Sequence, residues 1–328
     1  MNTFTPSPDD AAGSIRVLLA EGRFKEALDE FRRLEGRPVP PDLQLMAATA
    51  ATRLGDLGLG AALAEASLER FRARADDDGK MRAQNLLGVI EFERGDLDRS
   101  QHCFNEALGL ARALRDTLMT ARACNNLASI ADLQGNPSGA LTLYRSALLN
   151  YQRLGDRRGT AEAYHNLGIV FRQMGEWRDA ESAANQAVRH AESLVERSLL
   201  GIAVMGRAEI DLHRGELDMA RQQLAWAGSI ATEARDELGL IEVGLLRGQL
   251  ALAENEWERA LEEAENARRA ATEARAAVLQ AQCAAVSARA LKALNRPDLA
   301  EERREEAVRL FQAQGAQRRL RELEETFA

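Results

Sequence analysis

Histidine and cysteine are the residue types most often used for metal binding and nucleophilic catalysis, and this sequence contains few of them. Its 4 histidines and 3 cysteines include no HExxH and no CxxC motif. His102 and Cys103 are adjacent, and neighbouring residues on a helix point in different directions, so they are poorly placed to act together. The odd number of cysteines indicates a reducing compartment and not a disulfide framework. We therefore expect no catalytic residue, no metal and no cofactor.

Two short motifs resemble ligand-binding loops but lack essential parts. Gly58 and Gly60 lie in a glycine-rich stretch, yet no strand precedes it and the third glycine of a dinucleotide-binding turn is missing. The run from Asp76 to Gly79 lacks the spaced ligands and closing glutamate of a calcium loop. Both motifs fall on positions of an internal repeat, so we interpret the first as a packing site and the second as a helix cap.

Residues suited to a left-handed backbone return every 40 positions along most of the chain. They are Gly55, Gly95, Gly135, Gly175, Gly215, Asn255 and Asn295. Each is expected to end a helix. Acidic residues suited to cap the next helix recur at the same interval, at Asp76, Asp116, Asp156, Glu196 and Asp236. Each repeat is therefore predicted to be a helix, a tight turn, a second helix and a short loop.

Three columns of small residues share this register and lie 7 positions before, 5 after and 12 after each turn residue. In the first repeat they are Ala48, Gly60 and Ser67. Small residues in register predict helices that cross closely. The composition agrees, because 45% of the residues are hydrophobic but only 5% are aromatic, which is typical of an Ala- and Leu-rich helical protein. The predicted fold class is all-α, with about eight helical hairpins and a C-terminal capping helix.

The repeat register also suggests how the chain is divided. Residues 1–13 are polar and are expected to form a disordered tail. Residues 14–41 are expected to form a divergent first hairpin, and residues 42–314 seven repeats. Residues 315–328 are expected to form a polar capping helix, which an open-ended helical array needs for solubility.

The columns resemble those of the tetratricopeptide repeat, which has a Leu-Gly pair on its first helix and alanines on both sides of its second. The pair stands here as Leu87-Gly88, Leu127-Ala128 and Leu167-Gly168. The usual unit of that family has about 34 residues, and the longer unit here is similar to the repeats of Pins and LGN-type polarity adaptors and of kinesin light chain. The resemblance implies a right-handed α-α superhelical solenoid whose first helices line a concave, peptide-binding groove.

The family uses an asparagine directly before the Leu-Gly pair to hold the backbone of a bound peptide, because an amide can donate and accept at once. That role carries over to Asn126 and Asn166 and, with a shift of one residue, to Asn85. Arg122 and Arg172 are expected to select an acidic side chain or a terminal carboxylate. The full set of candidate peptide-binding residues is Arg82, Asn85, Arg122, Asn125, Asn126, Asp132, His165, Asn166 and Arg172.

Later repeats depart from this pattern. The asparagine position holds Gly206, Leu246 and Val286 instead, and further apolar residues occur nearby at Met205, Leu245, Leu252 and Ala285. We expect an apolar surface in this second half, suited to an amphipathic helix or to a second copy of the chain, so that a homodimer is possible.

The formal net charge of -8 disfavours nucleic acid and anionic membranes as partners. The predicted function is a non-enzymatic, cytoplasmic adaptor or scaffold of bacterial type that binds an extended peptide segment of a protein partner. Two alternatives stay open: a peptide-responsive regulatory sensor of the quorum-sensing receptor type, and a self-assembling structural protein. The identity of the partner does not follow from the sequence.

Overall fold

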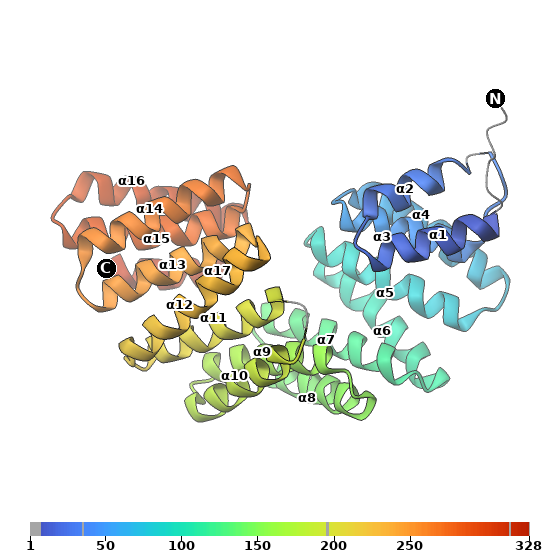
Figure 1. Ribbon diagram of the computed structural model, residues 1–328, viewed down its shortest axis with the longest axis horizontal. Helices are drawn as coiled ribbons and strands as arrows, with labels where there is room; N and C mark the ends of the chain where they lie inside the picture. The colour runs from blue at the N-terminus through green and yellow to red at the C-terminus, as the bar shows by residue number, and fades with distance from the viewer. Residues whose placement is uncertain (1–7, 35, 195–196, 315, 328) are drawn as a thin grey trace. The chain divides into compact units, whose positions relative to one another are not determined.

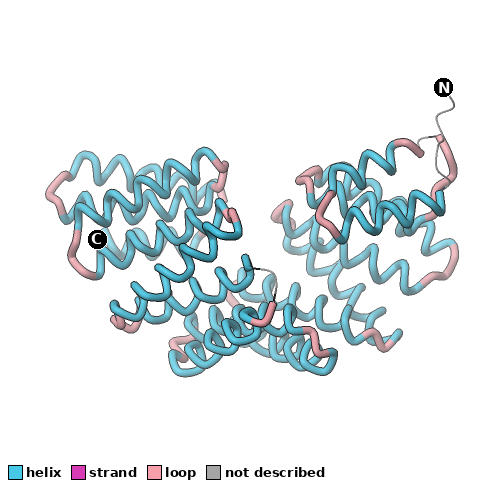
Figure 2. Tube along the Cα trace, in the orientation of Figure 1, coloured by secondary structure: helices cyan, strands magenta, loops and turns pink. Residues whose placement is uncertain are grey.

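The computed structural model describes residues 8–34, 36–194, 197–314 and 316–327. In these residues the backbone forms 17 α-helices joined by turns, and no strand (Figure 2). The chain divides into two compact units, Met1–Gly155 and Asp156–Ala328, called unit 1 and unit 2 below.

The helices of unit 1 are α1 (Pro8–Ala20), α2 (Phe24–Arg32), α3 (Pro41–Arg53), α4 (Leu57–Ala73), α5 (Asp77–Glu93), α6 (Leu97–Leu114), α7 (Thr117–Leu133) and α8 (Pro137–Leu154). Those of unit 2 are α9 (Arg157–Gln173), α10 (Trp177–Glu192), α11 (Arg197–His213), α12 (Leu217–Ala234), α13 (Glu237–Ala253), α14 (Trp257–Glu273), α15 (Ala277–Ala293), α16 (Pro297–Ala313) and α17 (Gln317–Phe327). In each unit, consecutive helices pack as hairpins, from α1 with α2 to α15 with α16, and α17 follows the last one (Figure 1). The predicted all-α repeat of about eight hairpins and a final helix is confirmed.

The tight turns inside the hairpins have the predicted left-handed backbone. All seven turn residues have positive φ, between 56° at Asn295 and 82° at Gly95. A second left-handed column lies between the hairpins and was not predicted. Its described members are Ala75, Arg115, Gly155, Arg235 and Arg275. Most of them are not glycine, so their residue types gave no sign of this conformation.

Aspartates begin the first helix of several hairpins. Asp76, Asp116, Asp156 and Asp236 each accept a hydrogen bond at 2.9 Å from the backbone N–H three residues ahead. These bonds satisfy N–H groups that the helix itself leaves free, and each contributes about 1 kcal/mol. The predicted caps are confirmed at these four positions. Glu196, the fifth, lies outside the described residues.

The small-residue columns mark close helix crossings, as predicted. Ser100 on α6 donates a hydrogen bond of 2.8 Å to the Gly88 carbonyl on α5, and both residues are buried. A Cβ atom added to Gly88 would lie 2.6 Å from the Phe104 ring, so a larger residue has no room there. The core between the helices is therefore built from small residues set against a few large ones.

The two ends of the chain are also helical. The disordered tail predicted for residues 1–13 extends too far into the chain, because α1 begins at Pro8. Ala11 and Ile15 of this helix are buried against α2 and α3. Proline is favoured in the first turn of a helix, and the apolar spacing continues from it. Residues 1–7 lie outside the described residues. At the other end, Leu320 and Leu323 of α17 pack on the last hairpin.

Candidate functional site

The first helices of the hairpins form one side of each unit. We call this surface the A-helix face; it consists of α3, α5 and α7 in unit 1 and of α9, α11, α13 and α15 in unit 2. Four pairs of successive members contact each other: α3 with α5, α9 with α11, α11 with α13, and α13 with α15. The nine candidate residues lie on α5, α7 and α9.

On α5, Arg82 is held by groups of its own chain. Its guanidinium forms ion pairs of 2.9 Å with Asp78 on the same helix and with Asp42 on α3. It also lies 5.6 Å from the centre of the Phe71 ring, within cation–π range. These contacts join two neighbouring hairpins, so Arg82 has a structural role that the sequence did not suggest.

Asn85, one turn further along α5, has a different environment. It is half-buried, and its buried Oδ1 atom has no hydrogen-bond donor among the described residues. A buried amide oxygen without a donor is costly, by about 1–3 kcal/mol.

On α7, Arg122 and Asn125 occupy the register positions of Arg82 and Asn85. Arg122 is exposed and forms no ion pair within the described part of the chain. Asn126 is half-buried, and its side chain has no hydrogen-bond partner there either. The α7 surface therefore presents one cation and one amide that are available to a ligand.

The remaining α7 candidates belong to a polar cluster at the middle of the helix. Ser129 lies 2.9 Å from the Tyr144 hydroxyl and 3.2 Å from the Asn125 carbonyl, to which it donates. Burial raises the pKa of Tyr144 to about 12, and the charge of Asp132 adds to this effect, while the hydrogen bond with Ser129 opposes it. Tyr144 is therefore a neutral hydroxyl at physiological pH.

In unit 2, Arg172 was predicted to be available to an acidic group of a ligand, but the structure places it in an ion pair of its own chain. Its guanidinium pairs with Glu209 of the adjacent helix α11. His165, on the same face of α9, lies against the backbone of α11, where a Cβ added to Gly206 would be 3.0 Å from the His165 Nδ1 atom. Burial lowers the pKa of His165, with Glu209 opposing the shift and Arg172 adding to it. Both residues thus connect two hairpins. Asn166 is half-buried and has an internal partner.

Two acidic residues of the unit 2 A-helix face were missed by sequence reasoning. Glu209 is the partner of Arg172, and Glu242 on α13 is half-buried with no ion pair among the described residues. Burial raises the pKa of Glu242, and the charges of Glu209 and Asp236 raise it further. Reading the sequence in the 40-residue register would have placed these carboxylates on the same face as Arg172.

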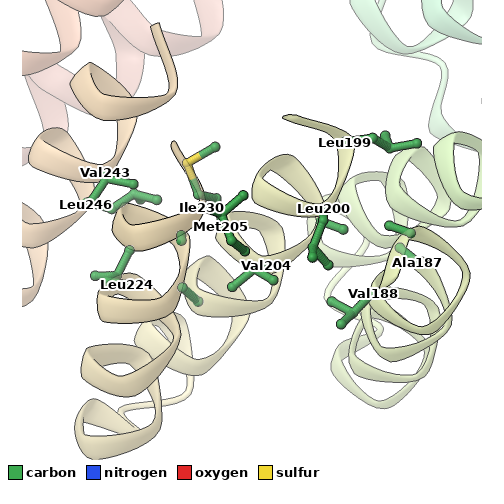
Figure 3. Packing of buried hydrophobic residues seen from close by; sticks show 14 of the residues in the cluster. Ala187, Val188, Leu199, Leu200, Val204, Met205, Leu224, Ile230, Val243 and Leu246 are labelled. Atoms are coloured by element: carbon green, nitrogen blue, oxygen red, sulfur yellow. The ribbon is translucent and has the colours of Figure 1, made fainter. Parts of the chain in front are cut away.

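The apolar surface expected in the second half is instead core. Met205, Leu245, Leu246, Leu252 and Val286 are each less than 9% exposed. Figure 3 shows Met205 and Leu246 among the buried residues between α11 and α13. Adjacent A helices contact each other closely in unit 2, and these side chains fill the space between them, so they offer no surface for a second copy of the chain.

No group of three or more metal-ligating side chains occurs among the described residues. In the same residues, no helix is both long and apolar enough to span a membrane.

Comparison with protein-family models identifies tetratricopeptide repeats in this chain. Residues 79–153 and 119–193 each match the tetratricopeptide-repeat model. The two matches together span the hairpins from α5 to α10. A relative among well-characterised proteins, the 43 kDa receptor-associated protein of the synapse from Tetronarce californica, is 22% identical over 179 residues. That alignment covers 54% of this chain and 42% of the relative, so the chain spans less than half of that protein.

Several solved structures share the fold. The apo form of the quorum sensor NprR from B. thuringiensis gives a TM-score of 0.75 at 13% identity, covering 95% of this chain and 89% of that one. The apo form of RapI gives 0.71 at 14% identity, covering 83% and 97%. A Rap protein in complex with competence and sporulation factor gives 0.66 at 14% identity, covering 97% of both chains. At these identities the likeness extends to the fold alone.

Proposed function

We propose that this chain is a non-enzymatic adaptor that binds an extended segment of a partner protein, with its main contacts on the A-helix face of unit 1. The tetratricopeptide-type repeat fold supports a protein-interaction module. The observation that carries the proposal is the pair of polar groups without an internal partner on α7, the Asn126 amide and the Arg122 guanidinium, together with the half-buried Asn85 on α5.

These groups define the chemistry of the segment. The Asn85 and Asn126 amides bind peptide backbone, which every extended chain exposes regardless of its sequence. Arg122 selects an acidic side chain or a terminal carboxylate through paired hydrogen bonds. On unit 2, Asn166 would make a separate backbone contact, whereas His165 and Arg172 serve to hold α9 against α11. Arg82 likewise supports α5 and does not contact the ligand.

A library of random displayed peptides of about 12 residues, selected against the full chain, tests the proposal. We expect the selected peptides to be enriched in Asp or Glu. The double change of Asn85→Ala and Asn126→Ala should weaken their binding by about tenfold or more in calorimetry. The circular dichroism spectrum should stay unchanged, and the thermal midpoint should not fall, because Asn85→Ala removes a buried oxygen without a donor.

Asn105→Ala is the matched control, because Asn105 is an exposed asparagine on the second helix α6 of the same hairpin as Asn85. It should leave affinity unaltered. If the peptides bind the double variant as tightly as they bind the unaltered chain, the A-helix face of unit 1 is not their site.

A second candidate function, a peptide-responsive sensor, is favoured by the fold likeness to the quorum sensor NprR and to the Rap protein complexed with competence and sporulation factor. A sensor must change conformation when it binds. With a selected peptide in hand, small-angle scattering separates the two: an adaptor keeps its radius of gyration, whereas a sensor changes it.

A further inference from the structure

A groove of about 840 Å³ lies in unit 2 between the second helices α12 and α14, with α13 as its floor. The α13 residues that line it include Glu237, Leu240, Gly244 and Arg247. Their spacing places them on one face of the helix, opposite Glu242 and the rest of the A-helix face. This groove is therefore a different surface from the one proposed to bind an extended peptide.

Gly228 on the α12 wall replaces a larger side chain of the repeat. At the same register position other hairpins carry Leu68, Leu108 and Val188, all of them buried. The space above Gly228 is partly taken by the side chain of Arg247.

A second glycine lies on the floor of the groove. Gly244 stands at the position held elsewhere by Gln84, Cys124 and Val204, which are also buried. A Cβ on Gly244 would lie 3.1 Å from the Cβ of Ala267, so α13 and α14 approach each other closely here. Gly244 therefore allows the α14 wall to lie close to the floor.

Arg247 is the third departure from the repeat pattern. It occupies the position of the buried leucines Leu87, Leu127 and Leu167. Its guanidinium extends over Gly228, where an added Cβ would be only 2.9 Å from the Arg247 Nη2 atom. Arg247 is half-buried and has no carboxylate partner among the described residues, so an anionic group can bind it.

The opposite end of the groove is acidic. Glu233 near the end of α12, Glu237 at the start of α13 and Glu273 at the end of α14 all line it. Glu237 and Glu273 form no ion pair with the described residues, and Glu233 has only an exposed contact with Arg197 at 3.5 Å. The C-termini of α12 and α14 add partial negative charge at the same end.

Between these ends the lining is mixed. Leu240 is 42% exposed and Ala270 is half-buried, whereas Ile241, Val243 and Ala267 are buried. Ser229, Thr232, Glu263 and Asn266 add polar groups. Glu237 and Arg247 are ten residues apart on one helix, which corresponds to about 15 Å. The groove therefore combines a small apolar area around Leu240 with a cluster of carboxylates at one end and an unpaired arginine about three turns away.

We propose that this groove binds an amphipathic helix of a partner protein, with a Lys or Arg at one end of its apolar face and an Asp or Glu about three turns away. The basic side chain pairs with Glu237 and Glu273, and the acidic side chain pairs with Arg247. The apolar face of the helix covers Leu240 and Ala270. The charge arrangement fixes the direction in which the helix lies.

The test uses synthetic helical peptides of about 16 residues with one Leu and Ala stripe and three charge patterns: matched, reversed and uncharged. Fluorescence polarisation with the full chain should show the matched peptide binding about tenfold or more tightly than the reversed one, with a preference that weakens at high salt. Equal binding of the matched and reversed peptides, or no binding of either, overturns the proposal.

Two variants locate the site. Gly228→Leu with Arg247→Leu restores the residues that other repeats carry and fills the groove; without Arg247, the nearest neighbour of the new Cβ is Val243 at 3.6 Å. This variant should bind the matched peptide about tenfold or more weakly. Glu237→Gln with Glu273→Gln should reduce binding without filling the groove, which keeps the test valid if the first variant does not fold.

Glu258→Gln with Glu262→Gln is the control, because these exposed α14 residues change the net charge equally but do not line the groove. It should bind like the unaltered chain. If the control loses as much affinity as the Glu237 and Glu273 variant, the peptide is attracted by the net charge of the chain and not by the carboxylates that line the groove. The Asn85 and Asn126 double variant should bind the helix normally, which separates this proposal from the function of the A-helix face.

Discussion

On α7 of unit 1 the A-helix face carries an exposed Arg122, whereas the same register position in unit 2 holds Ile202 and Glu242. The neighbouring amides of unit 1 persist in unit 2 as Asn166 on α9, but α11 and α13 carry buried residues such as Met205 and Leu245 nearby. Unit 2 instead leaves its open surface between second helices, where glycines replace packed side chains. Both units use one 40-residue frame, and a few positions in that frame determine which face keeps groups free for a partner.

The largest expected effect concerns Gly88 and Gly168, which share one register position in units 1 and 2. A Cβ on Gly88 would lie 2.6 Å from the buried Phe104 ring, whereas a Cβ on Gly168 would have no neighbour closer than 3.6 Å. Gly88→Ala should lower the free energy of unfolding by about 2 to 3 kcal/mol through overpacking. Gly168→Ala should raise it by about 0.5 to 1 kcal/mol, because alanine is the better helix former.

Urea unfolding of both variants measures this difference. Gly88→Ala combined with Phe104→Leu is the control, since the smaller side chain makes room for the added methyl group and should recover part of the loss. If the two alanine variants change the free energy of unfolding equally, the Phe104 ring beside Gly88 is not the cause of the predicted difference.

The fold could be predicted from the sequence because its turns and helix starts require backbone and capping geometry that few residue types adopt. Gly55 and Asn255 identify turns, and Asp76 identifies a helix start, whatever surrounds them. The site was harder to predict. Arg172 has the same residue type and face as Arg122, yet it is paired with Glu209, a residue 37 positions away. Only the contact between successive hairpins determines which arginine remains available.

A second contrast concerns buried carboxylates at one register position. Glu91 in unit 1 forms an ion pair with Arg94, with 3.0 Å between Oε1 and Nη1. Asp211 in unit 2 is one methylene shorter, and its Oδ2 atom has no hydrogen-bond partner among the described residues. Arg214, in the register of Arg94, pairs instead with Glu216 at 2.8 Å. Burial raises the pKa of Asp211 to about 6.

Replacing each carboxylate by alanine, which other repeats carry here as Ala131 and Ala251, should have opposite effects. Glu91→Ala loses an ion pair and should lower the free energy of unfolding by about 1 to 2 kcal/mol. Asp211→Ala should raise it by about 1 to 2 kcal/mol at about pH 7, because the ionised carboxylate is buried without a partner.

The pH dependence checks the cause of the Asp211 effect. Its folded pKa lies above the ordinary value, so the folded state holds the proton more tightly and this residue destabilises the fold as the pH rises from about 4 to about 6. The advantage of Asp211→Ala should therefore shrink toward zero below about pH 4, as measured by urea unfolding across that range. An advantage that is constant with pH would point to packing and not to charge.

The smallest expected effect lies at the left-handed residues between hairpins, where unit 1 has Gly155 with φ 67° and unit 2 has Arg235 with φ 54° at the same register position. A side chain in this conformation costs free energy that glycine avoids. Gly155→Ala should therefore lower the free energy of unfolding, and Arg235→Gly should raise it, each by about 0.5 to 1 kcal/mol. Arg235→Ala separates backbone from charge: it removes the guanidinium but keeps the Cβ atom, so it should leave stability near that of the unaltered chain. If Arg235→Ala stabilises as much as Arg235→Gly, the arginine charge and not its backbone conformation is the source of the strain.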